Sequence, residues 1–129
     1  MTPFWQDYNH QLSPGKLKYA SAAVLAGGAS RRMGIRKELI PINGSPLVRV
    51  VLDQLSYVFP EVFVISDSIE ALSFLGVPII RDLEPGRGPL MAIITALQES
   101  RHNTVFIAAC DMPDINFELI SRLFARPEN

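Results

Sequence analysis

Four short apolar runs, separated by longer amphipathic segments, constrain the fold of this chain more than any other feature. The runs span residues 21–25, 62–65, 77–80 and 104–109, and none of them alternates polar with apolar residues. Strands without such alternation are typical of a parallel sheet that helices cover on both faces. The pattern therefore predicts a three-layer αβα domain with a mainly parallel, Rossmann-like sheet.

Helical spacing of apolar residues connects these runs. Pro46 and Pro89 each begin such a segment, and proline is well placed in the first turn of a helix. A third helix is expected over 116–124 with Asn116 as its N-cap, and a shorter one near 69–74. We expect the apolar faces of the second and third helices to pack inward, with these residues on them: Leu90, Ile93, Ile94 and Leu97, then Leu119, Ile120 and Leu123.

The chain of 129 residues with 48% hydrophobic content is long enough for one domain and one core. We assign this domain to residues 20–129 and treat residues 1–19, which mix aromatic, acidic and proline residues, as an irregular N-terminal arm. The last expected helix ends almost at Asn129, so the sheet has no room for further strands and the architecture looks C-terminally short.

Charge and cysteine content exclude several classes of protein. Twelve basic and 13 acidic residues give a net charge of −1, which provides no field for duplex nucleic acid or an anionic membrane. Cys110 is the single cysteine and cannot form an internal disulfide, and no apolar run is long enough to cross a membrane. Together with an N-terminus unlike a signal peptide, this predicts a cytoplasmic protein.

The segment Leu25–Lys37, LAGGASRRMGIRK, carries the strongest functional signal. It directly follows the first expected strand, where open α/β sheets bind ligands. Gly27 and Gly28 have no side chain that would keep a phosphate from the backbone N–H groups, and Ser30 supplies a hydroxyl. Four cations for a polyphosphate follow in the same segment: Arg31, Arg32, Arg36 and Lys37. A loop of this length is usually functional, and its spacing fits neither a P-loop nor G-x-G-x-x-G.

Two further strand ends supply carboxylates. Asp82 begins the loop of RDLEPGRGPL and could accept hydrogen bonds from ribose hydroxyls. Gly86 and Gly88 would let that loop close over a base. A plain connection from strand to helix is an equal alternative for this segment. Asp111 ends the apolar run before Met112 and Pro113. Because Mg²⁺ prefers one or two hard carboxylates together with substrate phosphates, Asp111 is the metal candidate, and a turn-capping aspartate is the alternative reading.

Taken together, LAGGASRRMGIRK, the proline-led helix after NGSP, RDLEPGRGPL and ACDMP resemble the molybdenum cofactor guanylyltransferases, the MobA-like nucleotidyltransferases, from about Ala22 to Pro113. The resemblance implies a fold of the nucleotide-diphospho-sugar transferase type. It also implies Mg²⁺-dependent transfer of GMP from GTP to the phosphate of molybdopterin, with release of pyrophosphate. An oligomer or partner proteins of molybdoenzyme assembly would fit the same setting.

The resemblance also assigns roles to individual positions. Lys37 would bind the phosphates and, with Arg31, would act in catalysis; Asp111 would bind Mg²⁺. Backbone contacts to the guanine nucleotide would come from Leu25, Ala26, Gly27 and Gly28, and Asp67 and Asp82 would lie near the nucleoside. Because of its hydroxyl, we also count Ser30 among the nucleotide-binding residues.

Two departures keep alternatives open. Relatives commonly have an aspartate directly before the motif lysine, whereas this chain has Arg36, and relatives usually continue well past this length. A nucleotidyltransferase for a sugar phosphate or another cofactor phosphate is the nearest alternative. A GTP-binding module without catalytic activity is the alternative from a different class.

Overall fold

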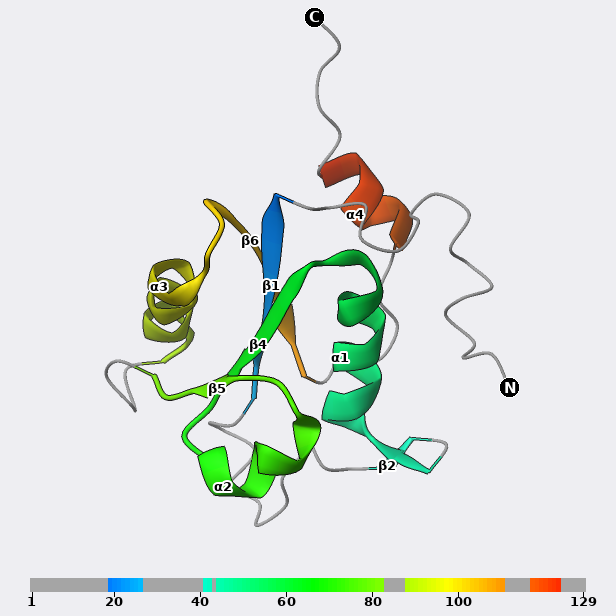
Figure 1. Ribbon diagram of the computed structural model, residues 1–129, viewed down its shortest axis with the longest axis vertical. Coiled ribbons are helices and arrows are strands. Elements are labelled where there is room, and N and C mark those ends of the chain that lie inside the picture. Colours follow the sequence, from blue (N-terminus) through cyan, green and yellow to red (C-terminus); the bar gives the residue numbers. More distant parts are fainter. Residues whose placement is uncertain (1–18, 27–40, 43, 83–87, 111–116, 124–129) are drawn as a thin grey trace, which may run out of the picture.

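The computed structural model describes residues 19–26, 41–42, 44–82, 88–110 and 117–123 (Figure 1). Four parallel strands form its main sheet, in the order β5-β4-β1-β6. They are β1 (Ala20–Leu25), β4 (Glu61–Ile65), β5 (Ile79–Ile80) and β6 (Thr104–Ala109). The predicted parallel α/β fold is confirmed, although the run at 77–80 contributes a strand of only two residues.

The helices lie where the sequence predicted them. They are α1 (Leu47–Val58), α2 (Ile69–Leu72), which continues into the 3₁₀ helix η4 (Ser73–Leu75), α3 (Pro89–Glu99) and α4 (Phe117–Leu123). In Figure 1, α1 and α4 lie on one face of the sheet and α3 on the other, which gives the expected three layers. A two-residue hairpin, β2 (Pro41–Ile42) with β3 (Ser45–Pro46), was not predicted, because two residues cannot show a strand period.

The central strand β1 is buried on both faces, and its small side chains let helices approach from both sides. Ala20, Ala22 and Val24 face α1 and α4, whereas Ala23 faces α3; all four are fully buried. Successive side chains of a strand point to opposite faces, so one short strand serves two cores. The larger of these cores contains the fully buried or nearly fully buried side chains Val48, Val51, Leu52, Leu55, Val58, Val64, Leu72 and Ile120.

The expected inward faces of two helices were partly wrong. On α3, Leu90 is 68% and Leu97 is 53% exposed, while Ala92, Thr95 and Ala96 are buried. The small residues face the sheet because they allow the helix backbone close to it, and the leucines therefore fall on the far side of the same helix.

On α4 only one of the three expected residues points inward. Ile120 is 1% exposed and belongs to the larger core, but Leu119 and Leu123 are 51% and 62% exposed. A short helix at the end of a sheet buries only the few side chains that point directly at the core. The apolar residues of α4 cover a wider part of its surface, so some of them remain exposed. The proposed N-cap, Asn116, lies outside the described residues.

Arg49 fastens the segment after β4 to α1. Its guanidinium donates from Nη1 to the carbonyl of Leu75 and from Nη2 to the carbonyl of Phe74, each at 3.1 Å, and its central carbon lies 5.9 Å from the centre of the Phe74 ring. Carbonyls at the end of a helical segment have no partner within that segment, so a planar donor with two N–H groups satisfies both. α2 and η4 are thereby held against α1.

Replacing a core leucine should cost far more stability than replacing an exposed one. Leu52→Ala removes a side chain that is 1% exposed in the larger core, and we expect a loss of about 2–5 kcal/mol in the free energy of unfolding. Leu123→Ala, at a position that is 62% exposed, should change it by less than about 0.5 kcal/mol. Urea unfolding of both variants measures the difference, and equal losses would contradict the assignment of this core.

Candidate functional site

Backbone hydrogen bonds hold the carboxyl ends of all four parallel strands in one row. Because each bond joins the last residues of two neighbouring strands, the residues that follow them leave the sheet along one edge. The bonds run from Ser66 N–H to the Ile80 carbonyl (3.0 Å), from Ala26 N–H to the Ile65 carbonyl (3.0 Å), and from Cys110 N–H to the Leu25 carbonyl (3.2 Å).

This edge contains the point where the order of the sheet reverses. The chain runs from β1 through α1 to β4 and β5 on one side, and then through α3 to β6 on the other side of β1. In open parallel sheets a crevice forms at such a point, outside the carboxyl ends of the two diverging strands. Here those strands are β1 and β6. β1 ends at Leu25 and is followed by Ala26, and β6 is followed by Cys110.

Asp67 is held in a tight turn at the end of β4. Ser66 and Ser68 on either side are buried, and the backbone N–H of Ser68 donates to Ser66 Oγ at 3.0 Å. Serine hydroxyls often accept a hydrogen bond from a backbone N–H two residues on. Here this hydrogen bond places the half-buried Asp67 between two buried, hydrogen-bonded serines. The structure thus brings Asp67 to the same edge as Leu25 and Ala26.

Asp82 follows β5 and lies beside α3. The hydroxyl of the fully buried Thr95 is 3.4 Å from Asp82 Oδ1 and 2.9 Å from the Met91 carbonyl, so its stronger hydrogen bond is to Met91. Thr95 was not predicted as a site residue, although it supplies a hydroxyl among the small residues of α3 that face the sheet. At the other end of this loop Gly88 has φ of +84°, a conformation that favours glycine, directly before α3 begins.

The remaining predicted site residues lie outside the described residues, and their roles stay predictions. They are Gly27, Gly28, Ser30, Arg31, Lys37 and Asp111. In the sequence Gly27 directly follows Ala26 and Asp111 directly follows Cys110, and the described Ala26 and Cys110 lie at this edge. Within the described ranges, no three His, Cys, Asp or Glu side chains gather as a metal site.

A parallel sheet that reverses its order at β1, with a glycine-rich segment following that strand, is the arrangement of a nucleotide-binding α/β domain. The family model for the MobA-like NTP transferase domain matches residues 22–129, so this chain belongs to that family. Among solved structures, molybdopterin-guanine dinucleotide biosynthesis protein A of Archaeoglobus fulgidus is 28% identical with a TM-score of 0.61, over 81% of this chain and 53% of its own.

Two curated relatives are named as molybdenum cofactor guanylyltransferases. A probable molybdenum cofactor guanylyltransferase of Peptoclostridium acidaminophilum is 35% identical over 109 residues, which cover 84% of this chain and 49% of the relative. The molybdenum cofactor guanylyltransferase of Syntrophotalea carbinolica is 34% identical, over 81% of this chain and 50% of its own. The chain thus spans about half the length of the relatives it matches.

A more distant structure shares the fold alone. The CMP:2-keto-3-deoxy-manno-octonic acid synthetase, solved in complex with CTP, is 19% identical and superposes with a TM-score of 0.65 over 82% of this chain. Together with the Archaeoglobus fulgidus structure, it confirms the predicted nucleotide-diphospho-sugar transferase type of fold. Separately, none of the helices in the described ranges is long and apolar enough to span a membrane.

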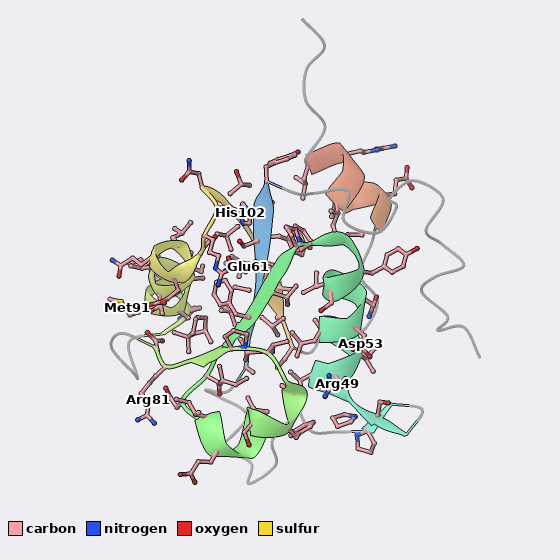
Figure 2. All side chains as sticks on the ribbon, viewed as in Figure 1. Arg49, Asp53, Glu61, Arg81, Met91 and His102 are labelled. Carbon is pink, nitrogen blue, oxygen red and sulfur yellow. The ribbon has the colours of Figure 1, made fainter. Side chains whose placement is uncertain are left out.

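A polar network, absent from the sequence predictions, lies at the opposite, amino edge of the sheet. The fully buried Ser21 donates from Oγ to Glu61 Oε1 at 2.6 Å, so its oxygen accepts from Nδ1–H of His102 at 2.8 Å. Ser100 Oγ lies 2.9 Å from Ser21 Oγ, and the backbone N–H of Arg101 donates to Glu61 Oε1 at 2.9 Å. Figure 2 shows Glu61 and His102 together near the end of the strands opposite Arg81.

This network favours the ionised form of Glu61. Burial raises the pKa of its carboxyl, but the hydrogen bonds from Ser21 and the Arg101 amide, with the charges of Arg101 and His102, outweigh burial and lower the pKa overall. An acid whose pKa is lower in the folded state stabilises the fold above its unfolded pKa of about 4.3, and this contribution is lost as the pH falls through the folded value.

Glu61→Gln should therefore lower stability at neutral pH and make little difference in acid. The amide keeps an acceptor for Ser21 but removes the charge, so the free energy of unfolding should fall at pH 7, and the gap to the wild type should close below about pH 4. Urea unfolding across this range measures it, with the exposed Glu70→Gln as control. A gap that is independent of pH would refute the electrostatic role of Glu61.

Proposed function

We propose that this chain is the nucleotide-binding part of a molybdenum cofactor guanylyltransferase, which transfers GMP from GTP to the terminal phosphate of molybdopterin. The observation that carries the proposal is the row of hydrogen-bonded strand ends, because Ala26, Asp67, Asp82 and Cys110 lie along it, and in the sequence Ala26 and Cys110 directly precede the glycine-rich segment and Asp111. Family membership and the names of the relatives support the same reaction.

The transfer needs no nucleophilic side chain. An oxygen of the molybdopterin phosphate attacks the α-phosphorus of GTP, a new P–O bond forms, and the bond from that phosphorus to the bridging oxygen of the β-phosphate breaks. Pyrophosphate leaves with the electron pair. The attacking phosphate is already ionised at neutral pH, so the protein's tasks are alignment and charge neutralisation.

The residues of the motifs divide these tasks. In the proposal, Lys37 and Arg31 bind the phosphates, while the backbone from Leu25 to Gly28 and the hydroxyl of Ser30 hold the nucleotide. Asp67 and Asp82 would accept hydrogen bonds from the nucleoside. The fixed neighbours of Asp67 and the position of Asp82 beside Thr95 suit carboxylates that must stay in place.

Asp111 would hold Mg²⁺. Its carboxylate is a hard oxygen ligand, and in the sequence it directly follows Cys110, whose N–H donates to the carbonyl of Leu25. When bound, the ion would neutralise part of the negative charge on the phosphates of GTP. Cys110 is the single cysteine of the sequence and is not in a disulfide, as is usual for proteins of the reducing cytoplasm. We therefore propose that the protein is cytoplasmic.

Two other functions remain candidates. A nucleotidyltransferase for a sugar phosphate or another cofactor phosphate would share this fold. A GTP-binding module without turnover is the candidate from a different class. The first would prefer another nucleotide, and the second would bind GTP without releasing pyrophosphate.

Calorimetric titration of GTP, CTP, ATP and UTP with Mg²⁺, followed by a pyrophosphate-release assay with molybdopterin, distinguishes these functions. We expect selective binding of GTP and release of pyrophosphate. Selective binding of CTP would favour a sugar-type transferase, and GTP binding without release would favour the non-catalytic module. Failure to bind any of the four nucleotides would overturn all three.

Lys37→Ala should weaken GTP binding, because it removes a charge-assisted contact to the phosphates. We expect a loss of about 1.5–3 kcal/mol in binding free energy, measured by the same titration. Lys16→Ala is the matched control, since Lys16 lies outside the motifs. If both variants bind GTP like the wild type, the segment Leu25–Lys37 does not bind phosphate.

Asp111→Asn should reduce Mg²⁺-dependent turnover far more than thermal stability, because it removes the charge of the proposed metal ligand and keeps its shape. Asp114→Asn, three residues later, is the matched control and should retain activity. Pyrophosphate release across a series of Mg²⁺ concentrations and thermal unfolding measure the two effects. An equal loss of stability with unchanged Mg²⁺ dependence would instead assign Asp111 to a structural turn.

A further inference from the structure

Thr95 is the polar residue on the buried face of α3. The buried residues of this helix are Ala92, Thr95 and Ala96, and Thr95 is 0% exposed. A hydroxyl that is removed from water destabilises a fold unless it is hydrogen-bonded, whereas a valine of the same shape would carry no such cost. Packing against the sheet alone therefore does not account for a hydroxyl at this position.

Two acceptors lie within reach of this hydroxyl. Oγ1 of Thr95 is 2.9 Å from the carbonyl of Met91, one helical turn earlier, and 3.4 Å from Oδ1 of Asp82, which follows β5. A hydroxyl has a single proton, so it donates mainly to Met91 at the shorter distance. Rotation about the Cβ–Oγ1 bond redirects this proton to Asp82 without moving any heavier atom.

The carbonyl of Met91 does not depend on this side chain. In an α-helix a carbonyl accepts from the N–H four residues later, and α3 contains both Met91 and Thr95. A bond from a threonine hydroxyl to the carbonyl four residues earlier does not stabilise a helix. The contact with Asp82 is different, because it joins α3 to the segment that follows β5.

Asp82 lies just beyond the end of its strand. Ile80 is the last residue of β5, and Asp82 follows two residues later. In Figure 2, Arg81, directly before Asp82, lies on the same side of the molecule as Met91 of α3. Hydrogen bonds from a hydroxyl to a carboxylate are stronger than those between neutral groups. Thr95 thus provides a donor on a helix for a carboxylate that the strand itself does not contain.

We propose that Thr95 is a positioning residue for Asp82, and that its hydroxyl holds the Asp82 carboxylate where it accepts hydrogen bonds from the ribose hydroxyls of the nucleotide. The inference deepens the proposed function and rests on it. An ionised carboxylate has about four lone-pair positions, so it can accept from Thr95 and from the ribose together. The pair then favours nucleotides that carry ribose hydroxyls over those that lack them.

Thr95→Val tests the hydroxyl, because it keeps the shape of the side chain. Since Met91 keeps its helical partner, we expect thermal unfolding of this variant to stay close to that of the wild type. Thr95→Ser retains the hydroxyl and should retain nucleotide affinity. Thr104→Val, at the exposed start of β6 and at the opposite edge of the sheet, is the matched control.

Calorimetric titration with GTP and with dideoxy-GTP, which lacks both ribose hydroxyls, measures the positioning role. We expect Thr95→Val to weaken binding of GTP roughly two- to tenfold, the range of one net hydrogen bond, and to leave binding of dideoxy-GTP unchanged. In the background of Asp82→Ala, Thr95→Val should have no further effect, because the carboxylate through which it acts is missing. Thr95→Ser and Thr104→Val should bind both nucleotides like the wild type.

The outcomes separate the role of Thr95 from the proposed function. If the wild type binds GTP and Thr95→Val binds it equally well, the positioning role is overturned and the proposed function stands. Equal weakening of GTP and dideoxy-GTP, or a further loss in the background of Asp82→Ala, would also overturn the positioning role, since a general change in α3 would cause both. A wild-type chain that binds neither nucleotide would overturn the proposed function, and the role of Thr95 together with it.

Discussion

β1 is hydrogen-bonded on both sides, to β4 and to β6, and the position of every other part of the site depends on this pairing. Its residues 22, 24 and 26 are directed toward β4 and residues 23 and 25 toward β6, so the strand holds both neighbours in register up to its last residue. The bonds of Ala26 and Leu25 then bring the ends of β4 and β6 to the same level. A shift of one residue in either pairing would separate the segments that begin at this edge.

Side-chain size decides how closely the layers approach the sheet. Alanines occupy both faces of β1 and the inner face of α3, so the helix backbone packs near the sheet and larger side chains from β4 fill the remaining space. The same arrangement turns Leu90 and Leu97 of α3 outward. Close packing of small residues is therefore the reason that two leucines of α3 are exposed.

The two ends of the strands are stabilised by different chemistry. At the carboxyl edge, the turn between Ser66 and Ser68 and the positive φ of Gly88 shape the chain next to the strand ends. At the amino edge, the buried hydroxyl of Ser21 joins Glu61 of β4 to His102 before β6, which fastens three strands without occupying the site. A buried hydroxyl is costly unless it is hydrogen-bonded, so this network also favours one register of these strands.

The sequence by itself determined the parallel α/β class, the order of the elements and the segments that supply the proposed site, because apolar runs and glycine or proline positions are local signals. It could not determine which face of α3 packs inward, since several apolar residues compete and only the neighbouring sheet selects the small ones. Thr95 beside Asp82 and Ser21 beside His102 are contacts between residues far apart in the chain. Only the tertiary structure decided these, because they depend on the order β5-β4-β1-β6, which no local pattern contains.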